Sequence, residues 1–136
     1  GFVLIVIGGS LIFKTINPAQ TITLQNREQW GKIESEIELN KIVSENKDVI
    51  VDFTAKWCVA CKEYEEITFQ NKDVKKIFAN YKLYKIDVTD NSKNDQILMK
   101  KFNLSGPPAI LIFKDGKLFK KVIGYKNPES FLKVFE

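Results

Sequence analysis

The stretch that most constrains this chain runs from residue 49 to residue 62 and reads VIVDFTAKWCVACK. Its first five residues are mostly apolar and β-branched, which favours a strand buried on both faces. From Ala60 onward the apolar residues take helical spacing, at Ala60, Tyr64 and Ile67. The sequence therefore predicts a buried strand, a short turn and the beginning of a helix, with both cysteines of the chain at the junction.

The two cysteines, Cys58 and Cys61, stand at the predicted start of the helix with two residues between them. A helix start carries unpaired N–H groups and partial positive charge, which lower the pKa of a thiol placed there. We expect Cys58 to be the exposed, attacking thiol. Cys61, one turn further along, is expected to be more buried and to resolve a mixed disulfide.

Other uses of a close cysteine pair fit this chain less well. A structural disulfide that closes so short a loop constrains the unfolded chain little. A zinc site needs about four ligands, and the chain has two cysteines and no histidine. Attachment of c-type haem needs a histidine after the second cysteine, where this chain has Lys62. We therefore expect redox chemistry by the disulfide itself, with no metal and no other cofactor.

The hexapeptide WCVACK at residues 57–62 resembles the active site of the thioredoxin superfamily. More narrowly, it resembles the C-terminal periplasmic domains of the DsbD family of thiol:disulfide interchange proteins. That family has Val-Ala between its cysteines and continues, as this chain does, through KEYE to Thr68-Phe69. The resemblance covers about residues 30–135. It implies a thioredoxin fold, an α/β architecture with a mixed central sheet flanked by helices.

Length and composition limit the remaining possibilities. The 136 residues allow one domain with a core plus an extension. The net charge of +4 is mild, and the lysines cluster late among turn residues without interleaved aromatic residues, which is typical of a solvated face rather than a nucleic-acid site. The absence of histidine makes hydrolase triads and zinc enzymes poor candidates.

The N-terminal segment differs from the rest of the chain. Residues 1–13 are uncharged and mostly apolar, but a bilayer needs about 20 such residues. We interpret them as the end of a transmembrane helix, with a signal or anchor segment as the alternative and a buried strand as a further one. Residues 14–29 are polar, contain Pro18 and show no period, which indicates a linker. The thioredoxin-like domain is then predicted to span residues 30–136.

Within that domain the apolar spacing and turn residues predict the order β-α-β-α-β-α-β-β-α, with two helical pieces after the cysteines. The predicted strands are 30–33, 49–53, 83–88, 109–113 and 118–123. The predicted helices are 34–46, one from 60, one from 71, 92–102 and one that follows the cap at 127.

Two carboxylates are candidates for the chemistry. Asp52 lies in the apolar strand six residues before Cys58, and burial without a partner should raise its pKa. A carboxylate poised in this way can take the proton from Cys61 during exchange. Glu65, one helical turn after Cys61, is a second candidate, with a plain exposed helix residue as the alternative. The family resemblance implies that both positions modulate the cysteines.

Four more residues are site candidates through the resemblance. Trp57 precedes the first cysteine, and Pro107 and Pro108 lead into an apolar strand. The resemblance implies that Pro108 follows a cis peptide bond and faces the cysteines, beside a backbone on which a partner pairs as an added strand. Pro107 has no N–H, which removes one backbone bond from that pairing. Gly124 corresponds to a glycine near the family's active site.

The resemblance also implies a direction of electron flow. A membrane-embedded domain with cysteines would supply electrons, periplasmic thiol-disulfide proteins would accept them, and the domain would face the periplasm from the bacterial inner membrane. No nucleic acid is expected as a partner. A stand-alone membrane-anchored thioredoxin for cytochrome c maturation is one alternative. A non-catalytic binding module on a thioredoxin scaffold is another.

Overall fold

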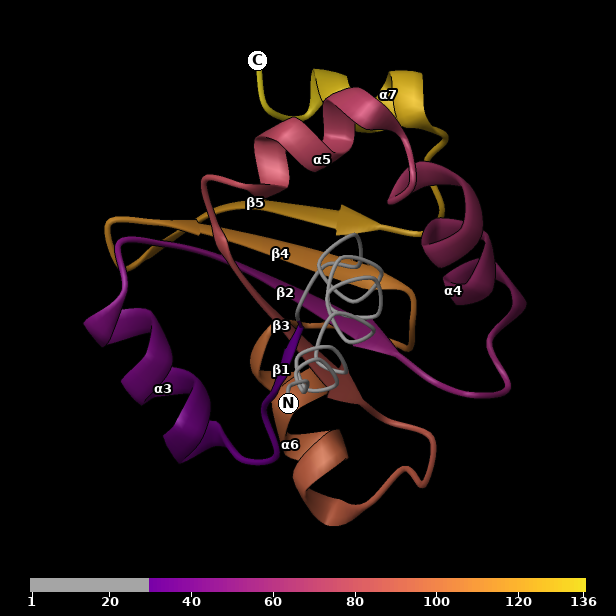
Figure 1. Cartoon of the computed structure of the whole chain (residues 1–136). Coiled ribbons are helices and arrows are strands. Elements are labelled where there is room, and N and C mark those ends of the chain that lie inside the picture. Colours follow the sequence, from indigo (N-terminus) through magenta and orange to yellow (C-terminus); the bar gives the residue numbers. More distant parts are fainter. Residues whose placement is uncertain (1–29) are drawn as a thin grey trace, which may run out of the picture.

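The computed structural model describes residues 30–136 and contains one five-stranded sheet with helices on both faces (Figure 1). The strand order is β1-β3-β2-β4-β5. The strands are β1 (Gly31–Lys32), β2 (Asp48–Thr54), β3 (Lys82–Asp87), β4 (Ala109–Lys114) and β5 (Lys117–Ile123). The helices are α3 (Glu36–Glu45), α4 (Val59–Glu63), the π-helical turn η1 (Tyr64–Thr68), α5 (Lys72–Phe78), α6 (Lys93–Lys101) and α7 (Pro128–Lys133).

The sheet is mixed, as the sequence predicts. β2 pairs in parallel with β3 and antiparallel with β4, and β4 pairs antiparallel with β5. The central strands β2 and β4 carry the most continuous apolar runs, because both of their faces are covered. In this register Phe53 pairs with Ala109, so the end of β2 and the start of β4 lie at the same end of the sheet.

Two apolar layers fill the space between the sheet and its helices. On one face, Val51 and Phe53 belong to a buried cluster that includes Leu39 of α3 and Leu98 of α6. The opposite face carries a cluster rich in aromatic rings, with Phe69 and Tyr64 near α5 and α7. Its buried members are Ile50, Tyr64, Phe69, Val74, Phe78, Ile110, Ile112, Val122 and Phe131. Figure 1 shows α5 and α7 on one side of the sheet and α3 and α6 on the other.

The predicted helix starts and the hairpin are present in the structure. Asn71 accepts hydrogen bonds from the backbone at the start of α5, and Ser92 forms a capping box with Asp95. Asp115 and Gly116 both have positive φ (52° and 78°), which is the geometry of a tight hairpin turn between β4 and β5.

One expectation about the cysteine helix is wrong. The spacing Ala60, Tyr64, Ile67 predicts that Ile67 points inward, but its side chain is 51% exposed. The helix widens after Glu63 into η1, where the N–H of Phe69 bonds to the carbonyl of Tyr64 at 2.7 Å. This wider turn shifts the side chains, so that Thr68 and Phe69 are buried in place of Ile67.

The predicted membrane-helix end (residues 1–13) and linker (residues 14–29) lie outside the described residues. Within residues 30–136, no helix has the length and apolar character needed to cross a bilayer.

Candidate active site

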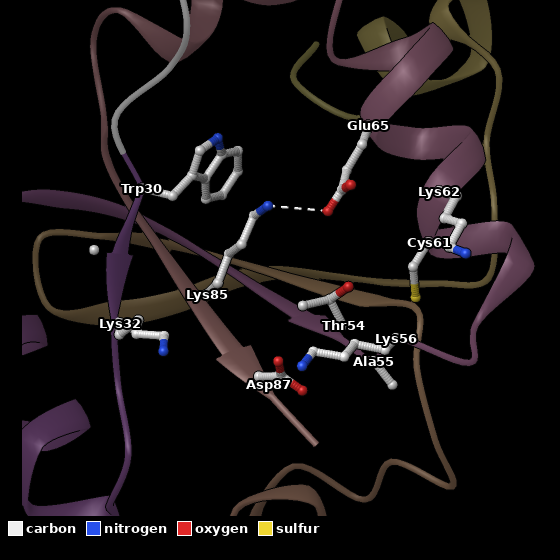
Figure 2. A pocket seen from close by; sticks show the side chains of 11 residues that line it. Trp30, Lys32, Thr54, Ala55, Lys56, Cys61, Lys62, Glu65, Lys85 and Asp87 are labelled. Atoms are coloured by element: carbon white, nitrogen blue, oxygen red, sulfur yellow. Dashed lines mark hydrogen bonds and ion pairs between the residues drawn. The ribbon is translucent and has the colours of Figure 1, made fainter. Parts of the chain in front are cut away.

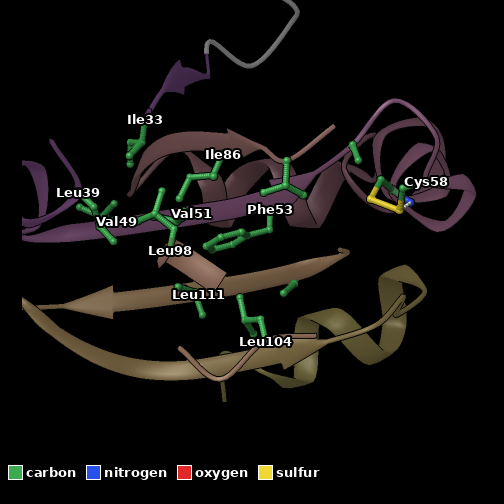
Figure 3. Close-up of a cluster of buried hydrophobic side chains, with 14 of the residues drawn as sticks. Ile33, Leu39, Val49, Val51, Phe53, Cys58, Ile86, Leu98, Leu104 and Leu111 are labelled. Carbon is green, nitrogen blue, oxygen red and sulfur yellow. Dashed lines mark hydrogen bonds between the residues drawn. A yellow bond between two sulfur atoms is a disulfide. The ribbon is translucent and has the colours of Figure 1, made fainter. Parts of the chain in front are cut away.

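The cysteine pair lies at the start of α4, just after the end of β2. The N–H of Cys58 bonds to the carbonyl of Ala55 at 3.1 Å, which turns the chain sharply after the strand. Cys58 then takes the N-cap position of α4 and is joined to Cys61 by a disulfide (Figure 3). Both cysteines are buried, with Cys58 6% and Cys61 3% exposed. Cys58 is the more accessible of the two, although it is less exposed than we expected.

The backbone around Cys58 suits a thiolate. The N–H of Cys61 donates to Cys58 Sγ at 3.1 Å, so a backbone donor already points at the sulfur that the sequence predicts to attack. Hydrogen bonds of this kind and the positive end of a helix both favour the charged form of a thiol. The local geometry therefore supports Cys58 as the nucleophile and Cys61 as the resolving thiol.

Asp52 is buried in β2 with a side chain that is 2% exposed. Its Oδ1 atom has no hydrogen-bond partner in the part of the chain that the structure describes. Burial raises the pKa of Asp52 from 3.8 to about 8. The positive charge of Lys85 lowers this pKa and the negative charge of Glu65 raises it. This value lies near the ordinary thiol pKa of about 8.5, so a proton can pass between Asp52 and a cysteine at little cost.

A cavity of about 650 Å³ opens beside Cys61. Glu65 and Lys85 face each other within it, between Trp30 and Cys61, with Lys85 Nζ 3.0 Å from Glu65 Oε2 (Figure 2). Lys85 Nζ also lies 5.4 Å from the centre of the Trp30 ring. Glu65 is thus paired with Lys85 at the edge of this cavity, with a side chain that is 43% exposed.

Trp57 is exposed but fixed in place. Its Nε1–H donates to the carbonyl of Thr89 at 3.0 Å, and the neighbouring N–H of Lys56 donates to Thr89 Oγ1 at 2.9 Å. Thr89 in turn donates to the Asp87 carboxylate through both its N–H and its hydroxyl. These hydrogen bonds hold the pKa of Asp87 below its usual value. The loop after β3 therefore anchors the segment that precedes Cys58.

The proline segment lies at the same end of the sheet. The peptide bond between Pro107 and Pro108 is cis, and Pro108 is buried while Pro107 is half-buried. The carbonyl of Pro108 accepts a hydrogen bond from the N–H of Gly124 at 3.0 Å. Gly124 has φ of +81°, a conformation that favours glycine. The structure thus brings Pro108 and Gly124 together, next to the strand that leads to the cysteines.

Sequence reasoning missed two supporting residues, Lys85 and Thr89. Lys85 lies beside Asp52 only because β2 and β3 pair in the register Asp52–Lys85. The alternation in residues 83–88 indicates a strand but does not say which residue of β2 each side chain will meet. Thr89 lies in the loop after β3, and nothing in its local sequence points to Trp57.

No group of three or more His, Cys, Asp or Glu side chains within residues 30–136 is placed to hold a metal ion. The arrangement that is present, a disulfide at the start of α4 and a buried carboxyl group on the preceding strand β2, is suited to thiol–disulfide exchange.

Comparisons with known proteins agree with this geometry. A family model described as a thioredoxin-like domain matches residues 36–136. The chain is 33% identical over 127 residues to the thiol:disulfide interchange protein DsbD of Campylobacter jejuni (strain RM1221), which covers 93% of this chain and 22% of that protein. It is 32% identical over 150 residues to DsbD of Haemophilus influenzae (strain PittGG), over 96% of this chain and 26% of the relative. The chain therefore spans about a quarter or less of these relatives.

Solved structures extend the match to the fold. The oxidised form of the Neisseria meningitidis DsbD C-terminal domain superposes with a TM-score of 0.63 and 28% identity. The match covers 74% of this chain and 89% of that domain. The reduced form of the same domain gives a TM-score of 0.60 with 30% identity, over 70% of this chain and 85% of that domain.

Proposed function

The chain belongs to the thioredoxin-like domain family and is homologous to the C-terminal domain of DsbD, and from this premise we propose that it is a protein-disulfide reductase. The observation that carries the proposal is the Cys58–Cys61 disulfide at the start of α4, in the same fold as a buried Asp52. The reaction is dithiol–disulfide exchange, in which the reduced cysteine pair supplies the two electrons.

The reaction begins with the reduced pair. The Cys58 thiolate attacks one sulfur of a partner disulfide, which breaks the partner's S–S bond and forms a mixed disulfide, while the other partner sulfur leaves as a thiolate. Cys61 gives its proton to the Asp52 carboxylate and attacks Cys58 Sγ. The Cys58–Cys61 bond forms and the partner's second thiolate is released. The partner gains two electrons, and the chain ends oxidised.

We propose that a membrane-embedded donor domain with cysteines, in the bacterial inner membrane, supplies the electrons and that thiol proteins in the periplasm accept them. The support for this proposal is the similarity of the chain to thiol:disulfide interchange proteins. Residues 1–29 would then form the membrane end and the linker. Trp57, Pro107, Pro108 and Gly124 are proposed to shape the surface on which the partner lies.

Cysteine variants test this proposal directly. We expect Cys58→Ser to abolish reduction of insulin by dithiothreitol, because it removes the attacking sulfur. Cys61→Ser should instead accumulate mixed disulfides, visible as mass-shifted adducts that dithiothreitol reverses. A Cys58→Ser protein with full activity would contradict the assignment as a protein-disulfide reductase.

A further inference from the structure

Two buried hydroxyl groups on η1 reach the same distant loop. The Tyr64 hydroxyl donates to the carbonyl of Gly124 at 2.7 Å, and the Thr68 hydroxyl donates to the carbonyl of Lys126 at 2.7 Å. The Thr68 hydroxyl also lies 3.1 Å from that of Tyr125. Tyr64 is 1% exposed and Thr68 is fully buried. Because buried polar groups need partners, these bonds tie η1 firmly to residues 124–126.

The widened turn makes this contact without losing apolar packing. The Tyr64 ring stacks on Phe69 at 5.2 Å between centroids and meets the Phe131 ring edge-on at 5.9 Å. Both hydroxyl-bearing side chains and Phe69 therefore face the sheet together, which the π-helical turn permits. Burial also raises the pKa of the Tyr64 phenol, so it keeps its proton and remains a donor.

The loop that Tyr64 holds is itself attached to the proline segment. Gly124 accepts from Tyr64 through its carbonyl and donates to the Pro108 carbonyl through its N–H at 3.0 Å. Ile123 pairs with Ala109, and Ala109 pairs with Phe53 near the end of β2. A Cβ atom at Gly124 would meet nothing within 4 Å, so one side of this residue is open. A continuous path thus runs from the cysteine helix through Tyr64 and Gly124 to Pro108.

We propose that Tyr64 is a positioning residue that holds the Gly124–Pro108 side of the partner-binding surface in place relative to the cysteines on the same helix. This inference rests on the proposed function, because it assigns that side to the partner. Tyr64 does not touch the reacting sulfurs in this role. Its loss should weaken partner binding and leave the chemical steps unchanged.

The variant Tyr64→Phe isolates the hydroxyl, since it keeps the ring and its packing. We expect the KM for insulin to rise about three- to ten-fold, the equivalent of one ordinary hydrogen bond, while kcat stays unchanged. The Gly124 amide should exchange its hydrogen faster in the same variant. Tyr81→Phe is the matched control, because Tyr81 packs its ring on Phe135, on a different part of the aromatic layer, and should leave both measurements unchanged.

A second pair of variants distinguishes the loss of a hydroxyl group from a general loss of folding. Thr68→Val removes the other hydroxyl group and should also raise the KM. Thr68→Ser keeps a hydroxyl group and should have a KM near that of the wild type. If the wild-type protein reduces insulin and Tyr64→Phe has the same KM as the wild type, the inference is overturned. Equal effects of Tyr64→Phe and Tyr81→Phe on KM would also overturn it. A wild-type protein that fails to reduce insulin would instead overturn the proposed function, so the two failures are distinguishable.

Discussion

Asp52 is a side chain that is placed at a cost to stability, and we propose that its benefit is chemical. An acid on a fully covered strand loses its hydration, and its Oδ1 atom has no protein partner within residues 30–136. The fold accepts this cost because the carboxyl group stays protonated up to a pH of about 8. Because this raised pKa is close to that of a thiol, the carboxylate form of Asp52 is a suitable proton acceptor for a thiol.

The raised pKa of Asp52 predicts that the stability of the folded protein depends on pH. The folded protein holds the Asp52 proton up to a pKa of about 8, whereas 3.8 is the ordinary value for the unfolded chain. Between these values the folded state binds more protons, so the free energy of unfolding falls as pH rises, by up to about 1.4 kcal/mol per pH unit. We expect Asp52→Asn to remove this loss, so that the oxidised variant exceeds the wild type in Tm increasingly from pH 5 to pH 9.

Thermal unfolding of the oxidised proteins at several pH values would measure this difference. Asp90→Asn is the control, because Asp90 is exposed and its variant should follow the wild type. If the curves for Asp52→Asn and the wild type run parallel over this range, Asp52 is not a neutral buried acid and its proposed role fails.

At the scale of elements, the ion pair between Lys85 and Glu65 connects β3 to η1 across the cavity beside Cys61 (Figure 2). Exposed ion pairs contribute little to stability, about 1 kcal/mol at most. The effect of this one is on charge, because Lys85 lowers the pKa of Asp52 and Glu65 raises it. Lys85 of β3 and Glu65 of η1 therefore act in opposite directions on the pKa of Asp52.

We predict that Lys85→Met raises the pKa of Asp52 above its wild-type value, because it removes the positive charge that lowers this pKa and leaves the Glu65 charge, which raises it, without its partner. The measurement is a titration of the Asp52 Cγ resonance by ¹³C NMR in the oxidised protein. Lys101→Met is a closely matched control, because Lys101 also pairs with an acid, Glu36 at 2.9 Å, and also lies over a ring, Phe102 at 5.8 Å. An equal midpoint in the two variants would contradict the prediction.

The elements also show what the sequence can and cannot predict. Residues 49–53 were predicted as a strand and β2 is Asp48–Thr54, because alternation and apolar runs are local properties. The π-helical turn was missed, since a change in hydrogen-bond register leaves no clear mark in apolar spacing. The cysteines and Asp52 were found from one contiguous stretch. Lys85 was not, because its place depends on how two separate strands pair.

At the scale of the whole molecule, the reduction potential of the Cys58–Cys61 pair reports the difference in stability between the oxidised and reduced forms. A strong oxidant is one whose reduced form is unusually stable. Here the stabilising features are modest, since the helix widens into η1 after the five residues of α4, and within residues 30–136 one backbone donor, the N–H of Cys61, points at Cys58 Sγ. A negative charge on Asp52 would work against a nearby thiolate.

We therefore predict a potential near that of thioredoxin, about −270 mV, or somewhat less negative, measured by equilibration with glutathione. Such a value lets the pair accept electrons from a donor and pass them to partners that are more oxidising. A value near −120 mV would mean that the domain donates disulfides, because about 30 mV corresponds to 1.4 kcal/mol and the reduced form would then be favoured by several kcal/mol more. A value well below −300 mV would mean a structural disulfide, since the pair would resist reduction by ordinary thiol donors, and the reductase assignment would fall with it.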